Sequence, residues 1–254
     1  MKLTRLSLVS TCLLAFASIV YGADILPVWP IPPAPAGTSR ATYPVPRVDW
    51  LAKFQTNLDK LKGGPYDLVF DGDSITDFWQ TTGKPVWTAH YGAIKAADFG
   101  ISGDQVQHLL WRLQNGELAG QNPKLIVLMI GTNNQGENPQ EVADGIKLVL
   151  NEYETRCPAA HILLLAVFPR AGDAKAPPRL WVESLNKIIS ATDYGARVTF
   201  LDIGPKFLQP DGTLTKEIMP DALHPSAKGY EIWADAIQSV VDTYFPPSTA
   251  PAAK

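Results

Sequence analysis

Cysteine is scarce in this chain, which has 254 residues but only two cysteines, Cys12 and Cys157. Two cysteines are too few for the disulfide-rich class of small secreted scaffolds. Basic residues are not in excess either, because 22 Lys and Arg stand against 25 Asp and Glu and give a formal net charge of -3. A chain without a basic excess lacks the charge that neutralises a phosphate backbone, so we expect no nucleic-acid partner.

Glycine and proline show no period, which excludes a collagen-like chain. Apolar residues make up 46% of the sequence, too many for a disordered chain. Because a domain typically takes about 100 to 200 residues, the length favours one large domain or two small ones, with a sizeable core.

The N-terminus carries an apolar run over residues 6–20, preceded by two basic residues and followed by the small residue Gly22. This pattern is typical of a signal peptide, which we place at residues 1–22. The run is shorter than the ~20 residues that span a bilayer. We therefore expect a secreted or periplasmic protein with no integral membrane span in the mature chain. Cleavage would remove Cys12 and leave a single cysteine, so no internal disulfide could form.

Proline is concentrated in residues 23–47, where it restricts the backbone and removes hydrogen-bond donors. We expect this segment to be an extended leader ahead of the folded domain. We place that domain at residues 48–246 and a short C-terminal tail at 247–254.

Beyond the leader, short apolar runs alternate with stretches of helical periodicity. Continuous apolar runs indicate strands buried on both faces, and they occur at residues 68–70, 96–99, 125–130, 162–168 and 198–201. Apolar residues share one helical face at 106–113, 142–153, 181–189 and 230–244. This alternation predicts a three-layer α/β/α domain around a mostly parallel, five-stranded sheet.

In such a sheet, ligands bind beyond the carboxyl ends of the strands. Polar, glycine-containing blocks follow the first three predicted strands, and a fourth polar block precedes the last helix. The blocks are Asp71-Gly72-Asp73-Ser74-Ile75-Thr76, Gly100-Ile101-Ser102-Gly103-Asp104, Gly131-Thr132-Asn133-Asn134 and Asp221-Ala222-Leu223-His224-Pro225. We therefore expect the functional residues in these four blocks.

Together the blocks contain the groups of a serine hydrolase. A serine hydroxyl such as that of Ser74 needs an imidazole to accept its proton, and the imidazole needs a carboxylate to fix its tautomer. His224 and Asp221 can supply both from one loop. The backbone N–H groups of Ser74 and Gly103 and the side-chain amide of Asn133 fit the role of oxyanion donors.

Each of these residues also has a structural interpretation. Ser74 could cap a helix, Asn133 could form an Asx turn, and His224 could be an ordinary loop histidine. Their occurrence together at successive strand ends favours the catalytic interpretation.

The four blocks resemble those of the SGNH/GDSL hydrolases, a family of serine esterases and lipases. The resemblance covers about residues 66–244. Within the family the chain is similar to the platelet-activating-factor acetylhydrolase Ib catalytic subunits, through the segments FGISGDQVQHLLWRLQNGEL, IVLMIGTNN and AVFPR. The resemblance implies a flavodoxin-like fold and a homodimer. The family pattern GxND reads GTNN here, with Asn134 replacing a carboxylate, as it does in the acetylhydrolase-like branch.

By this resemblance Ser74 is the nucleophile, His224 the base and Asp221 its orienting partner. Gly103 and Asn133 join the Ser74 N–H in the oxyanion hole. The implied reaction is a two-step acyl transfer through an acyl-enzyme, with no metal and no cofactor.

Other classes stay open at this point. Asp71-x-Asp73 at a strand end also fits a magnesium-dependent aspartyl phosphatase, although such an enzyme would want a lysine and a further acidic pair after later strands, where the blocks offer Gly103, Asn133 and His224. A non-catalytic carbohydrate-binding protein is the third class. An α/β-hydrolase lipase is disfavoured, because the chain has no G-x-S-x-G elbow and Asp221 lies only three residues before His224.

We expect the substrate to be a small ester, most simply an acetyl or other short acyl group on a carbohydrate. A short-chain phospholipid acetylhydrolase or lysophospholipase is the alternative. The candidate substrate-binding residues are Asp73, Trp79, Asn134 and Arg170. Trp79 and Trp87 could form an aromatic rim that stacks on sugars or acyl chains, and Arg170 follows the fourth strand.

Four other residues are expected to be structural. Trp111 and Trp233 occur at helical spacing and are predicted in the core. His90 and His108 have no partner evident from their spacing.

Overall fold

The computed structural model describes residues 18–21, 24–27 and 34–247. The chain divides into two compact units, Met1–Pro33 and Ala34–Lys254. In the first unit the described residues form strands β1 (Ser18–Tyr21) and β2 (Asp24–Pro27), which pair antiparallel. Most of the predicted signal peptide lies outside the described residues, as does all but the first residue of the predicted tail.

Five parallel strands form the sheet of the second unit, in the order β4-β3-β5-β6-β7. Their bounds are β3 Leu68–Gly72, β4 Ala96–Asp98, β5 Leu125–Met129, β6 His161–Leu165 and β7 Val198–Leu201. The neighbouring strands β3 and β5 are buried at every position, which explains their unbroken apolar sequences. The predicted α/β sheet is confirmed, although the strand expected at 162–168 ends at Leu165.

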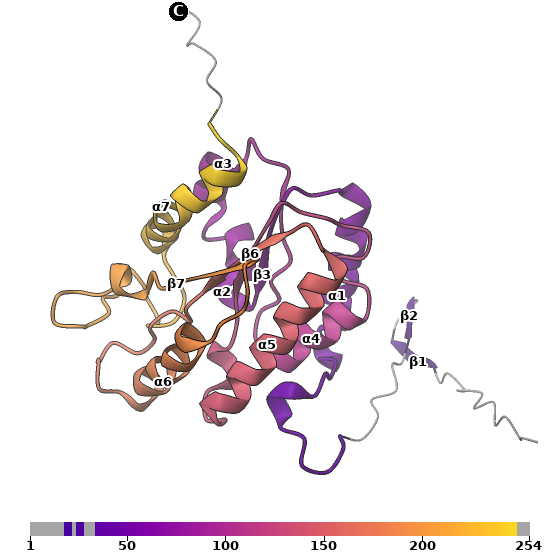
Figure 1. Cartoon of the computed structure of the whole chain (residues 1–254), viewed down its shortest axis with the longest axis horizontal. Helices are drawn as coiled ribbons and strands as arrows, with labels where there is room; N and C mark the ends of the chain where they lie inside the picture. Colours follow the sequence, from indigo (N-terminus) through magenta and orange to yellow (C-terminus); the bar gives the residue numbers. More distant parts are fainter. Residues whose placement is uncertain (1–17, 22–23, 28–33, 248–254) are drawn as a thin grey trace, which may run out of the picture. The chain divides into compact units, whose positions relative to one another are not determined.

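Helices cover both faces of this sheet (Figure 1). One face carries α3 (Lys84–Tyr91) and α7 (Ala227–Tyr244), which contact each other. The other face carries α1 (Leu51–Lys60), α4 (Val106–Gln114), α5 (Pro139–Arg156) and α6 (Pro177–Ala191). The short helix α2 (Ser74–Asp77) follows β3 directly.

Short 3₁₀ turns complete the described chain. They are η1 Arg40–Thr42, η2 Val48–Trp50, η3 Leu61–Gly63, η4 Phe78–Gln80, η5 Thr132–Asn134 and η6 Gly204–Phe207. The sequence predicted α4 to α7 but not α1 or α3. Helix α3 buries only Val86 and Tyr91, so its apolar periodicity is weak.

Residues 38–50, which we call the N-terminal strap, lie on the second unit. Ala41 is fully buried, and a Cβ added at Gly145 of α5 would collide with its carbonyl. The Val45 N–H donates to the Gln107 carbonyl at 3.3 Å. Arg47 Nη1 donates to the Ser102 carbonyl at 2.6 Å. The described second half of the proline-rich leader therefore contacts the loop that follows β4.

Aromatic rings fill the space between the sheet and the α3–α7 layer. The Trp79 ring lies 5.1 Å from Trp233 and 4.4 Å from Tyr230, measured between ring centroids. Phe70 of β3 lies 5.0 Å from Trp87 in the same cluster. Trp233 is fully buried, as the sequence predicted, and the cluster fixes α7 against the sheet.

A buried guanidinium joins the ends of the two strands β3 and β4. Arg112 of α4 donates to Asp104 at 2.8 Å and to Asp71 at 3.1 Å, and it also pairs with Glu117. The Tyr153 hydroxyl donates to the other Asp71 oxygen at 2.7 Å. All five side chains are buried, and each carboxylate has a charged partner, as a low-dielectric interior requires.

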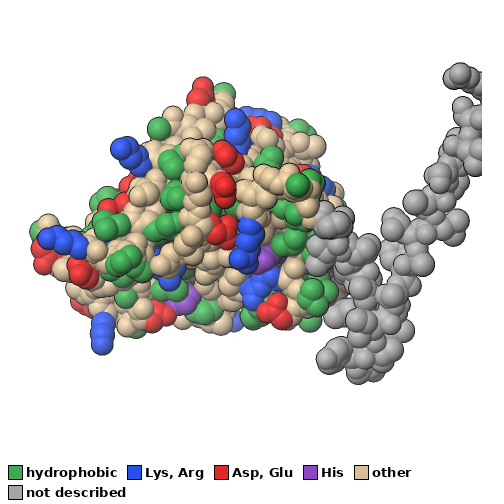
Figure 2. All heavy atoms as spheres, turned by 90° about the horizontal axis from the view of Figure 1, so that it is seen from below, with side chains coloured by type: hydrophobic (Ala, Val, Ile, Leu, Met, Phe, Trp, Pro, Cys, Tyr) green, Lys and Arg blue, Asp and Glu red, His purple; other side chains and the backbone are tan. Residues whose placement is uncertain are grey.

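The surface mixes charges of both signs. On the face drawn in Figure 2, acidic and basic side chains lie among apolar and uncharged ones. Within the described residues, none of the helices is both long enough and apolar enough to cross a membrane.

The Arg112 cluster makes a testable prediction about stability. Arg112→Ala removes the cation that three buried carboxylates share, of which Asp104 also pairs with Arg47 at 3.7 Å, so we expect the free energy of unfolding to fall by about 3–5 kcal/mol. The control is Arg156→Ala, whose ion pair with Glu152 lies near the surface of α5 and should contribute less than about 1 kcal/mol. Urea denaturation measures both values. Equal losses of unfolding free energy in the two variants would contradict the proposed contribution of the buried cluster to stability.

Candidate active site

Ser74 lies where β3 turns into α2. Asp73 is the N-cap of α2, and its Oδ1 accepts the Ile75 N–H at 2.9 Å. Gly72 allows this sharp turn, because a Cβ there would collide with the Met129 carbonyl of the neighbouring strand β5. The turn therefore presents Ser74 at the carboxyl end of the sheet, in the first turn of a helix.

The loop before α7 brings His224 and Asp221 to this serine. Ser74 Oγ lies 2.9 Å from His224 Nε2, and His224 Nδ1 lies 2.6 Å from Asp221 Oδ2. The other oxygen of Asp221 accepts the N–H groups of Leu223 at 3.0 Å and His224 at 2.8 Å. Residues 150 positions apart in the sequence thus form one hydrogen-bonded chain.

Electrostatics keep the Asp221 carboxyl ionised. Partial burial opposes its charge, but the hydrogen bonds from the His224 backbone and ring outweigh this, and the pKa of Asp221 lies below its ordinary value. The Phe78 ring lies 4.9 Å from the His224 ring, between centroids, and restricts how the imidazole can turn.

The second block contacts the turn that carries Ser74, and the third block contacts the second. The Ile101 N–H donates to the Gly72 carbonyl at 3.1 Å. Gly103 has a φ of +80°, a conformation that favours glycine, and its N–H lies on this same loop. Asn133 Nδ2 donates one hydrogen to the Asp104 carbonyl at 2.9 Å, so the amide has a second hydrogen to offer.

Two predicted substrate-binding residues do not reach a surface. Trp79 is fully buried in the aromatic cluster, so the expected sugar-stacking rim is wrong at this position. Asn134 is also fully buried, and its Oδ1 accepts the N–H of Val106, the first residue of α4, at 3.0 Å. Asn134 therefore joins the third block to the start of α4. The prediction that it contacts the substrate is wrong as well.

The other two candidates, Asp73 and Arg170, differ from each other in how far they are buried. Asp73 is fully buried, which overturns its predicted substrate contact, and in the described part of the chain its Oδ2 has no hydrogen-bond partner. Arg170 is only partly buried, and its Nη1 donates to the Thr132 carbonyl at 2.8 Å. Of the four candidates, Arg170 alone keeps exposed surface beside the third block.

Sequence reasoning missed residues that hold the second block from outside it. Asp77, three residues after Ser74, accepts the Ser102 hydroxyl at 2.6 Å and pairs with Lys53 at 2.9 Å. Arg47 of the strap bonds the Ser102 carbonyl on the other side. The position of Asp77 on the helix of the nucleophile was a usable signal, whereas nothing in the sequence links Arg47 to a loop 55 residues away.

The structure also bears on the phosphatase alternative. Asp71 is engaged by Arg112, by Tyr153 and by the Gly72 N–H, and Asp73 caps a helix, so the two carboxylates do not converge on a common cation position. Among the described side chains, the one group of three that could hold a metal ion lies outside the four blocks and consists of His90, Glu231 and Asp235.

Comparison with known proteins identifies the family. Residues 70–232 match the GDSL-like Lipase/Acylhydrolase family. The platelet-activating factor acetylhydrolase IB subunit alpha1 of Homo sapiens is 34% identical over 193 residues, which cover 76% of this chain and 82% of that protein. The corresponding subunit alpha2 of Rattus norvegicus is 35% identical over 182 residues, covering 71% and 78%.

Solved structures share the fold at lower identity. A GDSL-like lipase from Bacteroides thetaiotaomicron superposes with a TM-score of 0.63 at 20% identity, covering 76% of this chain and 98% of the other. An acetylxylan esterase from Geobacillus stearothermophilus gives a TM-score of 0.54 at 20% identity, covering 74% and 97%. The chain belongs to the GDSL-like lipase/acylhydrolase family, and it is a carboxylic ester hydrolase.

Asp73 gives a prediction about pH. Burial raises the pKa of Asp73 to about 7, against the opposing hydrogen bond from Ile75, whereas an aspartate in an unfolded chain titrates near ~3.9. Between about pH 4 and pH 7 the folded protein keeps a proton that the unfolded chain has lost, so this contribution to stability falls as pH rises. We expect Asp73→Asn to remove a slope of up to about 1.4 kcal/mol per pH unit.

Urea unfolding across this pH range measures the slope. The matched control is Asp193→Asn, because Asp193 accepts the Gly195 N–H at 2.9 Å in a similar local turn but is exposed. Its slope should equal that of the wild type. A slope unchanged by Asp73→Asn would contradict the assignment of a buried proton.

Proposed function

We propose that this protein is a secreted serine esterase that removes short acyl groups, acetyl above all, from carbohydrates. Ser74 is the nucleophile, His224 the general base and Asp221 the residue that orients it. The observation that carries the proposal is the hydrogen-bonded chain from Ser74 Oγ through His224 to Asp221, with separations of 2.9 Å and 2.6 Å.

The chain of hydrogen bonds fixes the tautomer of the base. The ionised Asp221 can only accept a hydrogen, so His224 Nδ1 carries the hydrogen and Nε2 has its lone pair free. Nε2 then accepts the Ser74 proton as Oγ forms its bond to the ester carbonyl carbon. Asp221 stabilises the imidazolium that results.

Three donors are proposed for the oxyanion. The Ser74 N–H lies in the first turn of α2, where backbone N–H groups lack acceptors within the helix. The Gly103 N–H and the second hydrogen of Asn133 Nδ2 complete the set. Donors fixed before the reaction stabilise the developing negative charge without reorganising, which is their advantage over water.

The imidazolium of His224 completes the reaction. It protonates the departing alcohol, whose bond to the carbonyl carbon breaks and leaves an acyl-serine at position 74. The neutral imidazole then takes a proton from water, whose oxygen attacks the acyl carbon. The bond from that carbon to Ser74 Oγ breaks, Oγ takes the proton back from His224, and the carboxylic acid leaves.

The acetyl preference is supported by the names of the similar proteins. The curated relatives are acetylhydrolases, and one solved neighbour is an acetylxylan esterase. For the leaving group we propose a carbohydrate, with the partly exposed Arg170 as a group that binds its polar atoms. A second candidate is an acetylated phospholipid, because the relatives at 34–35% identity are platelet-activating factor acetylhydrolase subunits.

Export is proposed from the N-terminal sequence. Its basic residues, apolar run and small residue at position 22 support a cleaved signal peptide and a periplasmic or secreted location. The homodimer implied by the family resemblance stays a prediction, which sedimentation analysis of the purified chain would test.

Substitution of the triad tests the proposed mechanism. We expect Ser74→Ala to lower kcat by roughly 10⁴- to 10⁶-fold, because only binding and the oxyanion donors would remain. His224→Ala should lose more than Asp221→Asn, since the asparagine still holds the ring through one hydrogen bond. Ser184→Ala is the control, because that hydroxyl bonds the Leu180 carbonyl on α6. Kinetics on p-nitrophenyl acetate give these values, and equal losses for His224 and Asp221 would contradict the assignment of the base.

A substrate series tests the acyl and leaving groups. Wild type and Ser74→Ala would be assayed on p-nitrophenyl esters of increasing chain length, on acetylated xylo-oligosaccharides and on an acetylated phospholipid. We expect the highest kcat/KM on acetyl esters and a preference for the sugar. A maximum at C8 or longer would overturn the acetyl assignment, and a preference for the phospholipid would select the second candidate.

The strap gives a prediction about the oxyanion loop. A Cβ at Gly103 would lie 2.6 Å from Arg47 Nη1, so Arg47 packs directly under the proposed donor. We expect Arg47→Ala to lower kcat about tenfold, equivalent to ~1.4 kcal/mol, with KM little changed, because a displaced donor weakens the transition state alone. Arg47→Lys should recover part of the loss, and Arg156→Ala should lose nothing. A change confined to KM would assign Arg47 to substrate binding instead.

A further inference from the structure

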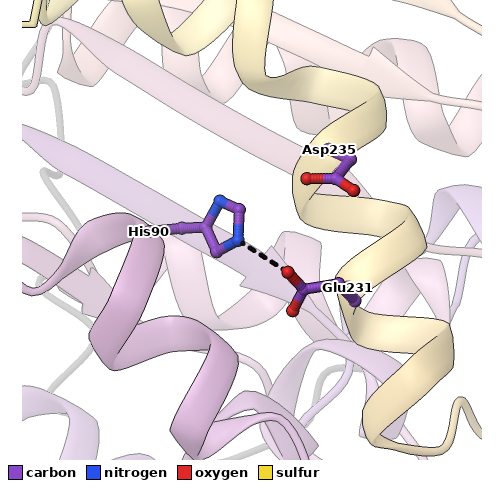
Figure 3. A group of neighbouring side chains, drawn as sticks. All are labelled: His90, Glu231 and Asp235. Atoms are coloured by element: carbon purple, nitrogen blue, oxygen red, sulfur yellow. Dashed lines mark hydrogen bonds and ion pairs between the residues drawn. The ribbon is translucent and has the colours of Figure 1, made fainter.

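His90 of α3 lies between oxygen atoms on both sides of its ring. Its Nδ1 is 3.2 Å from Gln238 Oε1, and its Nε2 is 3.3 Å from Glu231 Oε1. Both partners belong to α7, which packs against α3. Figure 3 shows that Glu231 points toward the imidazole and that Asp235 lies one helical turn further along α7.

The orientation of Gln238 decides which ring nitrogen carries hydrogen. Gln238 Nε2 donates to Asp242 Oδ1 at 2.7 Å, so the amide oxygen is the atom that faces His90. His90 Nδ1 is therefore the donor in that contact. A neutral imidazole has one N–H, so its Nε2 directs a lone pair at the Glu231 carboxylate. A contact of 3.3 Å between this lone pair and the carboxylate is favourable only with a positive charge between them, either a proton on Nε2 or a metal cation.

We propose that His90, Glu231 and Asp235 form a binding site for a divalent transition-metal cation of the zinc class. One ligand atom from each residue lies within 4.8 Å of the others. Zinc takes one imidazole nitrogen and carboxylate oxygens at ~2.0–2.2 Å, and a water can complete the tetrahedron. The outer contact from Gln238 holds the metal-binding tautomer, as the partners of metal-binding histidines do.

Exposure lets the carboxylates close around an ion. The Glu231 side chain is 51% exposed and Asp235 is exposed. Both side chains are therefore free to change rotamer and bring their oxygen atoms to a bound ion. The two carboxylates are four positions apart on α7, a spacing at which like charges repel. A bound cation would relieve this repulsion and link α7 to α3.

The proposed metal site is independent of the esterase chemistry. Within the described residues, none of its three side chains belongs to the four blocks around Ser74. Its effect would be mechanical, because α7 begins three residues after His224, and α3 follows the segment that carries Ser74. A bound metal would link α3 to α7, the two helices that adjoin the segments carrying Ser74 and His224.

Zinc titration of the full chain tests the proposal. We expect calorimetry to give the wild type one more bound Zn²⁺ than His90→Gln, and a rise in Tm with Zn²⁺ that His90→Gln lacks. Glu231→Gln and Asp235→Asn should each weaken the binding at least tenfold. Co²⁺ in place of Zn²⁺ should produce the visible absorption of a tetrahedral cobalt site in the wild type and not in His90→Gln.

Two controls separate this site from other histidines. His161→Gln, which removes a contact with Thr199 on β7, should bind as the wild type does. The one-ion difference between wild type and His90→Gln should persist in a His224→Ala background, which removes the proposed catalytic imidazole. Equal Zn²⁺ stoichiometry with and without His90, or no Zn²⁺ effect on the wild-type Tm, would overturn the metal site and leave a protonated His90–Glu231 ion pair.

Discussion

The buried guanidinium of Arg112 is the contact on which the arrangement of the loops depends. It bonds the carbonyls of Gly72 and Phe99 and the carboxylates of Asp71 and Asp104. Those groups belong to the ends of β3 and β4, where the proposed nucleophile turn and oxyanion loop begin. A lysine could not replace it, because only a planar guanidinium directs several fixed donors to separate acceptors at once. One cation therefore sets the spacing of two loops that are about 30 residues apart in the chain.

Other polar contacts between the loops around Arg112 also hold these loops in position. Asp77 holds Ser102 from the side of α2, and Asn133 bonds the Asp104 carbonyl from the third block. These contacts are short and partly buried, so each one fixes the position of a loop relative to its neighbour. Arg170 continues the series by bonding the Thr132 carbonyl. The active-site residues thus depend on neighbours that have no chemical part in ester hydrolysis.

The sequence was sufficient for the sheet, because strands such as 125–130 are apolar on both faces and could only be buried. It was also sufficient to bring Ser74, His224 and Asp221 together as a hypothesis, since serine, imidazole and carboxylate occur at the ends of predicted elements. It failed for Trp79, because exposure depends on which rings pack around a residue, and the sequence carries no record of that. The surface that the strap covers was missed for a similar reason, since proline content predicts extension but not the surface on which the extended chain lies.

The strap has a consequence for how the protein can be shortened. The family match spans residues 70–232 and begins after α1, so its limits leave out Arg47 and all of the chain that packs beneath Gly103. They also divide α7, which continues to Tyr244. A fragment trimmed to the limits of the family match would keep every proposed reacting group but would lose Arg47, which packs under the proposed donor Gly103. A shortened chain that is meant to keep full activity should therefore begin before the strap.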